Sequence, residues 1–346
     1  MIKPERLKRG DKVAIVSLSR GMLGESWAIH KLYIAKERME KDYGLEVVVM
    51  PNALKGMAYL DKHPQLRAQD LMDAFKDKSI KAIFNAIGGD DTIRLLPYID
   101  FDVIRKNPKI FTGFSDTTTN HFMMNKAGLV SYYGLSVLNN WSEYVKINDY
   151  TRDAIENILI NPKENYEILP SKVESFAKDI IWWSEDNINT PRKFYPNTRG
   201  YEVINGEEVV EGELLGGCIY SFIELLGTPL WPKKEEWEGK IILLETSDDD
   251  KNPLHLVKYV LRNLEAQGIF DIVKAVMIGR HPFEEEIEEY KNIFKQVIVE
   301  EGGHNIPIIY NLNVGHAEPI GLFPLGLKYR VDPKNKKITL LEMATK

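Results

Sequence analysis

A serine, a glutamate and a histidine each follow a short apolar stretch of this 346-residue chain, in that order. Ser115 comes directly after KIFTGF, Glu245 ends the stretch KIILLE, and His316 follows PIIYNLNVG. A hydroxyl is a poor nucleophile until a base takes its proton, and a histidine base works best when a carboxylate fixes its tautomer. If the fold brings them together, these residues predict hydrolysis of an acyl bond through a serine nucleophile.

The motif GFSD around Ser115 has two interpretations. The helical pattern DTTTNHFMMNKAG begins directly after the serine, and backbone N–H groups at such a helix start can stabilise an oxyanion. However, Ser and Asp are also the residues expected to cap a helix N-terminus. The motif has Thr117 where the familiar nucleophile turn has its second glycine. Taken alone, GFSD favours a helix cap.

Two glycines and two aspartates lie at the end of another predicted strand, in the motif IGGDD at 87–91. Gly88 and Gly89 let the backbone approach a ligand closely and can offer N–H groups to a developing negative charge. A tight turn capped by Asp90 or Asp91 explains the same residues equally simply, so this motif alone is a weak signal.

Glu245 and His316 also have structural alternatives. A carboxylate at the end of a buried strand needs a partner, and an ordinary ion pair supplies one as well as a histidine does. Of the seven histidines, His316 alone ends a strand within a glycine-rich loop, although a lone loop histidine is more often structural than catalytic. The combination of a serine, an acid and a histidine at three strand ends favours catalysis more than any one of them does.

Short β-branched stretches alternate with amphipathic helical patterns over most of the chain. The predicted strands cover residues 13–19, 45–50, 81–89, 109–114, 240–247, 273–280 and 307–316. Such alternation predicts an α/β fold with a mostly parallel sheet and helices on both faces. In sheets of this kind, ligands bind beyond the carboxyl ends of the strands, where the motifs above are placed.

The chain is long for one hydrophobic core, which favours two domains. We place the first at 1–140 and the second at 211–346. The connection, 141–210, is expected to begin with a helix over 141–160 and to continue as a loop dense in aromatic residues over 180–200. Composition alone does not distinguish a plain linker there from a functional loop.

The composition disfavours several other classes of protein. Lys plus Arg number 45 against 51 Asp plus Glu, and this net charge of −6 argues against nucleic acid as a partner. The single cysteine, Cys218, excludes an internal disulfide and a Cys-rich metal site, and no HExxH spacing occurs, so we expect no metal or cofactor. No GxGxxG follows the first strand, which disfavours an oxidoreductase. Without a signal-peptide pattern or a stretch near the ~18 to 20 apolar residues of a membrane helix, we expect a cytoplasmic protein.

The motifs TGFSD, IGGDD, ELLGGCI, LLGTPLWP, IILLETSDD, LEAQGIF…VMIGR and GHAEP…PLG together resemble the LD-carboxypeptidase family of serine peptidases. The resemblance covers nearly the whole chain. It implies a triad of Ser115, Glu245 and His316, with an oxyanion hole formed by the backbone N–H groups of Gly89 and Asp116. It also implies a Rossmann-like N-terminal domain that carries the serine, a smaller α/β C-terminal domain that supplies acid and base, and a homodimer.

Within this family, two features favour one branch. The chain has GGDD where murein-recycling members usually have GGYG, and its aromatic stretch resembles the extended loop of the microcin C self-immunity peptidases. Those enzymes cleave an amide that joins an aspartyl group to a nucleotide-like group. The resemblance implies a peptidyl or aminoacyl nucleotide as substrate, and the alternative is a murein tetrapeptide that loses its terminal D-alanine. The expected substrate-binding residues are Gly88, Asp90, Trp182, Trp183 and Arg192, with a tryptophan stacking on the nucleobase.

A non-catalytic binding module is the main rival from another class. Two α/β lobes also form sugar and amino-acid receptors, and an enzyme family can include degenerate regulatory members. The missing signal-peptide pattern speaks against a periplasmic receptor, and the intact serine, glutamate and histidine speak against a degenerate homologue.

Overall fold

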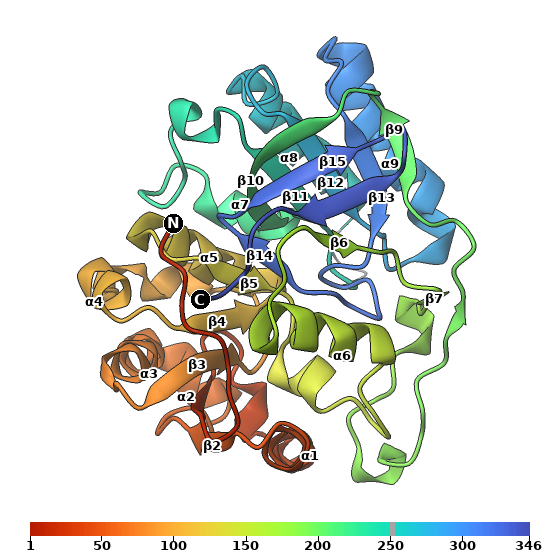
Figure 1. The fold of residues 1–346 in the computed structure, drawn as a ribbon. Coiled ribbons are helices and arrows are strands. Elements are labelled where there is room, and N and C mark those ends of the chain that lie inside the picture. Colours follow the sequence, from red (N-terminus) through yellow and green to blue (C-terminus); the bar gives the residue numbers. More distant parts are fainter. Residues whose placement is uncertain (250–252) are drawn as a thin grey trace.

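The computed structural model describes residues 1–249 and 253–346, and most of its strands belong to two large sheets (Figure 1). The first sheet has the strand order β14-β5-β4-β3-β1-β2. Its strands are β1 (Lys12–Val16), β2 (Glu46–Val49), β3 (Ile80–Asn85), β4 (Ile110–Gly113), β5 (Ser131–Tyr133) and β14 (Phe323–Leu325). Strands β1 to β5 run parallel, whereas β14, from near the C-terminus, pairs antiparallel with β5.

Both faces of the first sheet are buried. Successive side chains of a strand point to opposite faces, so each strand contributes residues to two cores. In β1, Val13 and Ile15 join the core on the side of α1 (Ile29–Lys41). Ala14 and Val16 join the core on the other side, with residues of α3 (Pro64–Lys76) and α5 (Thr118–Ala127). The continuous apolar stretches in the sequence therefore correspond to doubly covered parallel strands, as predicted.

The helices around the first sheet alternate with its strands. Besides α1, α3 and α5, this part of the chain contains α2 (Met57–Lys62), a 3₁₀ helix (Thr92–Tyr98) and α4 (Phe101–Lys106). Helix α5 ends at Gly128, which adopts φ +79° and closes the helix in the left-handed conformation that glycine accommodates without strain.

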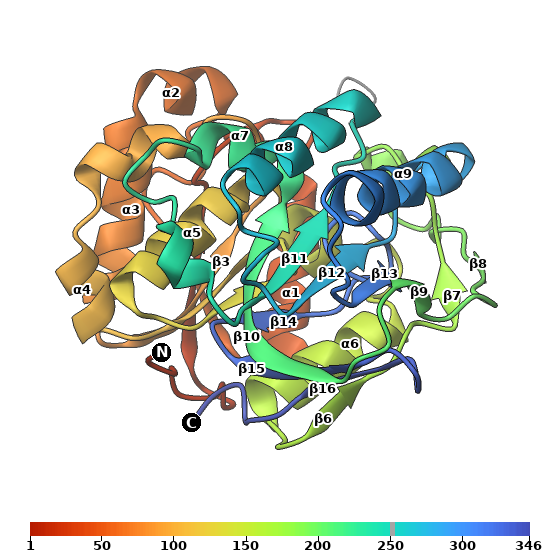
Figure 2. The same cartoon turned by 90° about the horizontal axis from the view of Figure 1, so that it is seen from above.

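The second sheet combines a parallel centre with antiparallel strands on both sides, in the order β6-β16-β15-β10-β11-β12-β13-β9. Its strands are β6 (Tyr166–Ile168), β9 (Glu202–Asn205), β10 (Val210–Cys218), β11 (Ile241–Glu245), β12 (Ala275–Gly279), β13 (Ile308–Leu312), β15 (Lys328–Asp332) and β16 (Lys337–Leu340). Strands β10 to β13 run parallel, and β15 and β16 form an antiparallel hairpin. Helices α8 (Leu254–Ala266) and α9 (Ile287–Phe294) cover one face of this sheet (Figure 2).

The connection between the two sheets differs from its prediction at one end. The expected helix over 141–160 begins only at Asp149, as α6 (Asp149–Ile155), and continues as a π-helical turn (Glu156–Ile160). The start is fixed by Asn148, whose side chain accepts a hydrogen bond from the Tyr150 N–H, because a capping side chain competes with helix further upstream. Beyond α6, the chain supplies β6 and β9 to the second sheet, and β7 (Val173–Glu174) pairs with β8 (Tyr195–Pro196).

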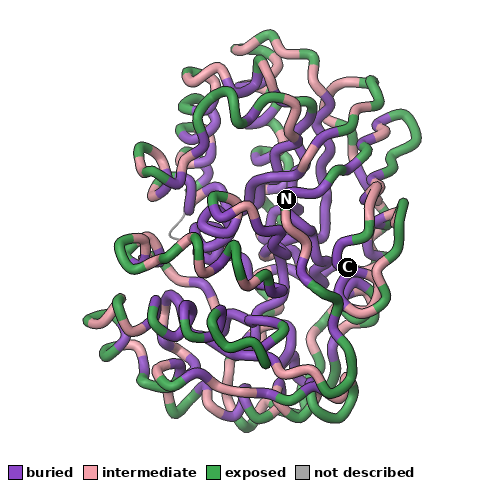
Figure 3. The backbone as a smooth tube through the Cα atoms, turned by 60° about the vertical axis from the view of Figure 1, so that its left-hand side comes forward, coloured by how far each residue is buried: buried purple, intermediate pink, exposed green. Residues whose placement is uncertain are grey.

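The two sheets, with the helices that cover them, form two lobes that share their hydrophobic cores. Each of the two clusters of buried apolar side chains includes residues of both sheets. Figure 3 shows buried backbone running through the middle of the molecule, with exposed segments at its periphery. The two ends of the chain also meet, since the Lys346 N–H donates to the Pro4 carbonyl at 2.9 Å. Within the described residues, none of the helices combines the length and apolar character needed to cross a bilayer. The fold is thus the expected α/β type, with a mostly parallel first sheet and a second mixed sheet.

Candidate active site

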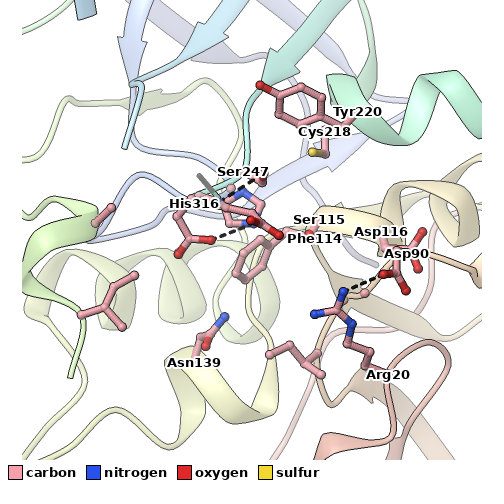
Figure 4. A pocket seen from close by; sticks show the side chains of 18 of the residues that line it. Arg20, Asp90, Phe114, Ser115, Asp116, Asn139, Cys218, Tyr220, Ser247 and His316 are labelled. Atoms are coloured by element: carbon pink, nitrogen blue, oxygen red, sulfur yellow. Dashed lines mark hydrogen bonds and ion pairs between the residues drawn. The ribbon is translucent and has the colours of Figure 1, made fainter. Parts of the chain in front are cut away.

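One cavity of about 760 Å³ lies where strands of the two sheets end (Figure 4). It is lined by Ser115, which follows β4, and by His316, which follows β13. Glu245, the partner of His316, is the last residue of β11. Gly88 and Gly89, which follow β3, also line it. The cavity therefore brings together the motifs that the sequence places at separate strand ends, and its volume is in the range of small-molecule sites.

Ser115 occupies a tight strand-to-helix turn. Its φ is +64°, a conformation that costs free energy for a residue with a side chain and that the surrounding structure must enforce. Gly88 permits this turn, because a Cβ at that position would lie 2.7 Å from the Ser115 Cβ. The capping interpretation is not supported, since Ser115 begins a 3₁₀ turn and Thr117 is the N-cap of α5.

Glu245 and His316 form a hydrogen-bonded pair. Glu245 is buried, and its Oε2 accepts from His316 Nδ1 at 2.7 Å and from the His316 backbone N–H at 3.3 Å. Gly315 makes this approach possible, because a Cβ there would fall 2.1 Å from the Glu245 carboxyl carbon. A proton on Nδ1 directed to a carboxylate leaves Nε2 as the basic nitrogen of the neutral ring, which is the tautomer that a general base requires.

The electrostatic surroundings of His316 favour its protonated form. Burial by itself lowers the pKa of the imidazole, but the negative charges of Glu245 and then Asp248 outweigh it and raise the pKa to about 9. Asp248 Oδ1 lies 3.9 Å from His316 Nε2. The Phe114 ring packs edge-on against the imidazole, with 5.1 Å between ring centroids, which links the residue before Ser115 to the histidine.

Asp116 holds the turn at Ser115 against the loop after β3. Its buried Oδ2 accepts from the Ser19 and Thr92 hydroxyls at 2.5 and 2.7 Å, and from the backbone N–H groups of Asp91 and Thr92. Burial, as the largest effect, raises the pKa of this carboxyl. The side chain is thus committed to structure, so that only the backbone N–H of Asp116 corresponds to the expected oxyanion donor.

The two aspartates of the GGDD motif have different surroundings. Asp90 lines the cavity and forms an ion pair with Arg20 at 2.6 Å. Asp91 instead receives two hydrogen bonds from the buried Arg67 guanidinium and one from Arg94. Asp91 is therefore an anchor for the loop, whereas Asp90 faces the space that a ligand would occupy.

Residues 180–200, which we call the aromatic segment, close one side of the cavity with Trp182, Trp183 and Arg192. Trp183 stacks on Trp27, with 6.0 Å between ring centroids, whereas the Trp182 side chain is 85% exposed. Arg192 is not a surface residue: its Nε lies 3.0 Å from the Glu143 carboxylate, and both side chains are largely buried. The residues expected to bind substrate thus reach one cavity, but only Trp182 has a largely free ring.

Several cavity residues have no counterpart in the sequence interpretation. Cys218, Tyr220, Ser221, Glu224, Asp248 and Glu318 line the same space. Glu224 is notable because its Oε2 is buried without a hydrogen-bond partner among the residues that the structure describes. Burial and then the charge of Asp116 raise the pKa of this carboxyl to about 8. No local pattern marks Glu224, which lies on the short helix α7 (Ile219–Leu225) within an apolar stretch.

Two α/β lobes with a cavity at the carboxyl ends of their strands, lined by apolar side chains and a few polar groups, are typical of enzymes that bind small molecules. Residues 13–134 match the family model described as the LD-carboxypeptidase N-terminal domain, and residues 211–331 match the LD-carboxypeptidase C-terminal domain. The chain belongs to the LD-carboxypeptidase family, a family of carboxypeptidase-type hydrolases.

Relatives in several bacteria cover most of the chain. It is 32% identical to the putative carboxypeptidase YocD of Bacillus subtilis, over 94% of this chain and 95% of that protein. It is 28% identical to the microcin C7 self-immunity protein MccF of Escherichia coli, over 80% of this chain and 78% of that protein. A probable murein peptide carboxypeptidase of Bacillus subtilis is 26% identical, over 96% of this chain and 92% of that protein.

Solved structures show the same architecture. The MccF-like protein from Streptococcus pneumoniae, crystallised with AMP, superposes with a TM-score of 0.87 at 36% identity, over 96% of this chain and 98% of that one. MccF in complex with aspartyl sulfamoyl adenosine superposes with a TM-score of 0.85 at 25% identity, over the full length of both chains. The expected family and fold are thereby confirmed.

Proposed function

We propose that the protein is a serine hydrolase of amide bonds in which Ser115 is the nucleophile, His316 its base and Glu245 the residue that orients the base. The observation that carries this proposal is the 2.7 Å hydrogen bond from His316 Nδ1 to the buried Glu245 carboxylate. It orients a basic Nε2 in the cavity to which Ser115, on its strained turn, also belongs. In this tautomer Nε2 can take the proton of a hydroxyl that comes within hydrogen-bond reach, which is the role proposed for it toward Ser115.

In the proposed reaction, the Ser115 oxygen bonds to the scissile carbonyl carbon while its proton passes to His316 Nε2. The carbonyl oxygen becomes an oxyanion, for which the backbone N–H groups of Gly89 and Asp116 are the proposed donors. The N–H of Ser115 itself is already donated to the Tyr133 hydroxyl at 3.1 Å, which supports the choice of its neighbour. The protonated histidine then gives its proton to the leaving nitrogen, and a water molecule repeats the sequence to release the acyl group.

The proposed substrate is a peptidyl or aminoacyl nucleotide. AMP and aspartyl sulfamoyl adenosine in the related structures support a nucleotide-like ligand. Trp182 supports it as well, because a largely exposed ring at the cavity wall can stack on a nucleobase without first breaking other contacts. Gly88, Asp90 and Arg192 are the further proposed contacts. A cytoplasmic location and a homodimer stay predictions from the sequence.

A murein tetrapeptide that loses its terminal D-alanine is the second candidate substrate. It is supported by the murein peptide carboxypeptidase among the relatives. A tetrapeptide has no nucleobase, so it offers no ring on which Trp182 can stack. The two substrates are therefore distinguishable by the part that this ring plays, as well as by direct assay.

The decisive experiment incubates the purified protein with aspartyl sulfamoyl adenosine and, separately, with the LD-tetrapeptide, and follows the products by mass spectrometry. Ser115→Ala should lower turnover roughly 10⁴- to 10⁶-fold, because the attacking oxygen is lost. Ser221→Ala is a matched control, since this second cavity serine donates to the Ser115 carbonyl at a long 3.3 Å, and it should keep turnover within about tenfold of wild type. Wild-type turnover by Ser115→Ala would refute the assignment.

A further inference from the structure

Tyr133 lies between the proposed nucleophile and the proposed acid. It is the last residue of β5, in the first sheet, and it is fully buried. Its hydroxyl oxygen is 3.1 Å from the backbone N of Ser115 and 2.5 Å from Glu245 Oε1. Glu245 belongs to the second sheet, so one phenol contacts functional groups from both lobes.

The directions of these hydrogen bonds follow from counting protons. The Ser115 N–H can only donate, and an ionised carboxylate can only accept. The single phenol proton must therefore point to Glu245 Oε1, while the phenol oxygen accepts from Ser115. Thr118 is also near, at 3.3 Å, but its hydroxyl lies closer to the Ser115 carbonyl, at 2.7 Å. The phenol stays protonated, because burial, with the charge of Glu245, raises the pKa of Tyr133 well above its ordinary value.

The two oxygens of Glu245 have separate partners. Oε1 accepts from Tyr133, and Oε2 accepts from His316. Without the phenol, Glu245 would keep His316 and the weakly donating Cys218 thiol as hydrogen-bond partners, and the buried carboxylate could rotate or draw the imidazole proton more strongly. The phenol thus affects both where the carboxylate points and how basic it is toward the histidine.

We propose that Tyr133 is a positioning residue of the proposed reaction, which fixes Glu245 against the Ser115 turn so that acid, base and nucleophile from two sheets stay aligned. This inference rests on the proposed function. Tyr133 does not touch the reacting atoms: it acts through the Ser115 backbone and through Glu245. Its role differs from that of an ordinary buried tyrosine whose hydroxyl needs only some acceptor.

The neighbouring residue supplies that ordinary case within the same strand. Tyr132 is equally buried, and its hydroxyl donates to the Ala344 carbonyl at 2.8 Å, with no link to the three proposed triad residues. Replacing either tyrosine by phenylalanine removes one buried hydroxyl and leaves the ring. Tyr132→Phe is therefore a matched control for the loss of a buried hydrogen bond, which costs about 1 kcal/mol of stability in general.

The first test compares Tyr133→Phe with Tyr132→Phe on whichever of aspartyl sulfamoyl adenosine and the LD-tetrapeptide the wild type hydrolyses. Tyr133→Phe should lower kcat roughly 10- to 100-fold with KM changed less than about threefold, and the acid limb of its pH–rate profile should move to higher pH. The sign follows because a carboxylate with fewer donors stabilises the protonated histidine more. Tyr132→Phe should leave both kcat and the pH profile unchanged. Equal behaviour of the two variants would overturn the inference.

A second test keeps the packing intact. Incorporation of 3-fluorotyrosine at position 133 makes the phenol a stronger donor, so it should move the acid limb to lower pH, opposite to Tyr133→Phe. An NMR titration of the His316 imidazole measures its pKa without substrate. If Tyr133→Phe fails to fold, the titration of the 3-fluorotyrosine protein still tests the proposal. Shifts in the same direction for both replacements, or no shift, would contradict the proposal. If Ser115→Ala stays active, the proposed function fails; if only the Tyr133 readouts stay unchanged, this inference alone fails.

Discussion

Two walls of the same cavity are built on different principles. The wall with Glu245 and His316 consists of buried groups at the ends of strands, where each carboxylate oxygen has a hydrogen-bond donor. The aromatic segment, which also lines the cavity, has little regular structure, and Trp182 is 85% exposed. A buried polar network tolerates few changes, because each lost partner leaves an unsatisfied group, whereas an exposed ring can be replaced at little cost in stability.

This difference indicates that the buried wall determines bond cleavage and the aromatic segment determines substrate binding, and mutations can separate the two. Changes in the buried wall should affect the rate of bond cleavage for every substrate. Changes in the aromatic segment should affect only the binding of substrates that carry a base.

Among the changes that compare the two walls, the largest effect is expected from Glu245→Gln. Tyr133 would continue to donate to the amide oxygen, so the amide nitrogen would face His316 Nδ1 and force that nitrogen to accept. The ring proton would then sit on Nε2, the wrong tautomer for a base, and kcat should fall roughly 10³- to 10⁴-fold. Steady-state kinetics measure this loss, and thermal unfolding serves as the control for folding. A loss below about tenfold would exclude Glu245 as the orienting acid.

A smaller and selective effect is expected from Trp182→Ala. Stacking of a base on an aromatic ring is worth roughly 1 to 3 kcal/mol, so KM for aspartyl sulfamoyl adenosine should rise about 5- to 150-fold with little change in kcat. Trp182→Phe keeps a ring and should recover most of the affinity. The LD-tetrapeptide should be unaffected by either change. An equal loss on both substrates would mean that the ring supports the segment itself rather than a nucleobase.

The smallest effect concerns the pH dependence. With the pKa of His316 raised to about 9, the base is protonated at neutral pH in the free protein, so kcat/KM should increase with pH toward that value. Asp248→Asn removes one of the charges that raise this pKa, at 3.9 Å from Nε2. The acid limb should therefore move to lower pH, by roughly 0.5 to 1 unit. A pH–rate profile of the variant measures the shift, and movement to higher pH would contradict the proposed arrangement.

Local patterns sufficed for the strands that present Ser115, Glu245 and His316. Each is a short stretch rich in β-branched and other apolar residues, and doubly covered parallel strands have this composition. What the sequence could not give is pairing between distant segments. The contact of Trp183 with Trp27 and the link from Tyr133 to Glu245 join residues more than 100 positions apart.

Tyr133 illustrates the limit most clearly. In the sequence it is one of two adjacent tyrosines in an apolar stretch, and nothing local distinguishes it from Tyr132. Only the packing of the second sheet against the first gives the two hydroxyls different partners. Glu224 is similar, because its buried oxygen, which has no hydrogen-bond partner in the described part of the chain, is recognisable only in the folded cavity.

The antiparallel strand β14 has a consequence for how the molecule is made. Residues 323–325 cover the edge of β5, and so they complete a sheet whose other strands are synthesised within the first 133 residues. While a ribosome extends the chain, the edge of β5 stays uncovered until residues 323–325 have emerged, and an open strand edge can pair with other chains. Truncation shortly before residue 323 should therefore yield a product prone to aggregation rather than a soluble first lobe.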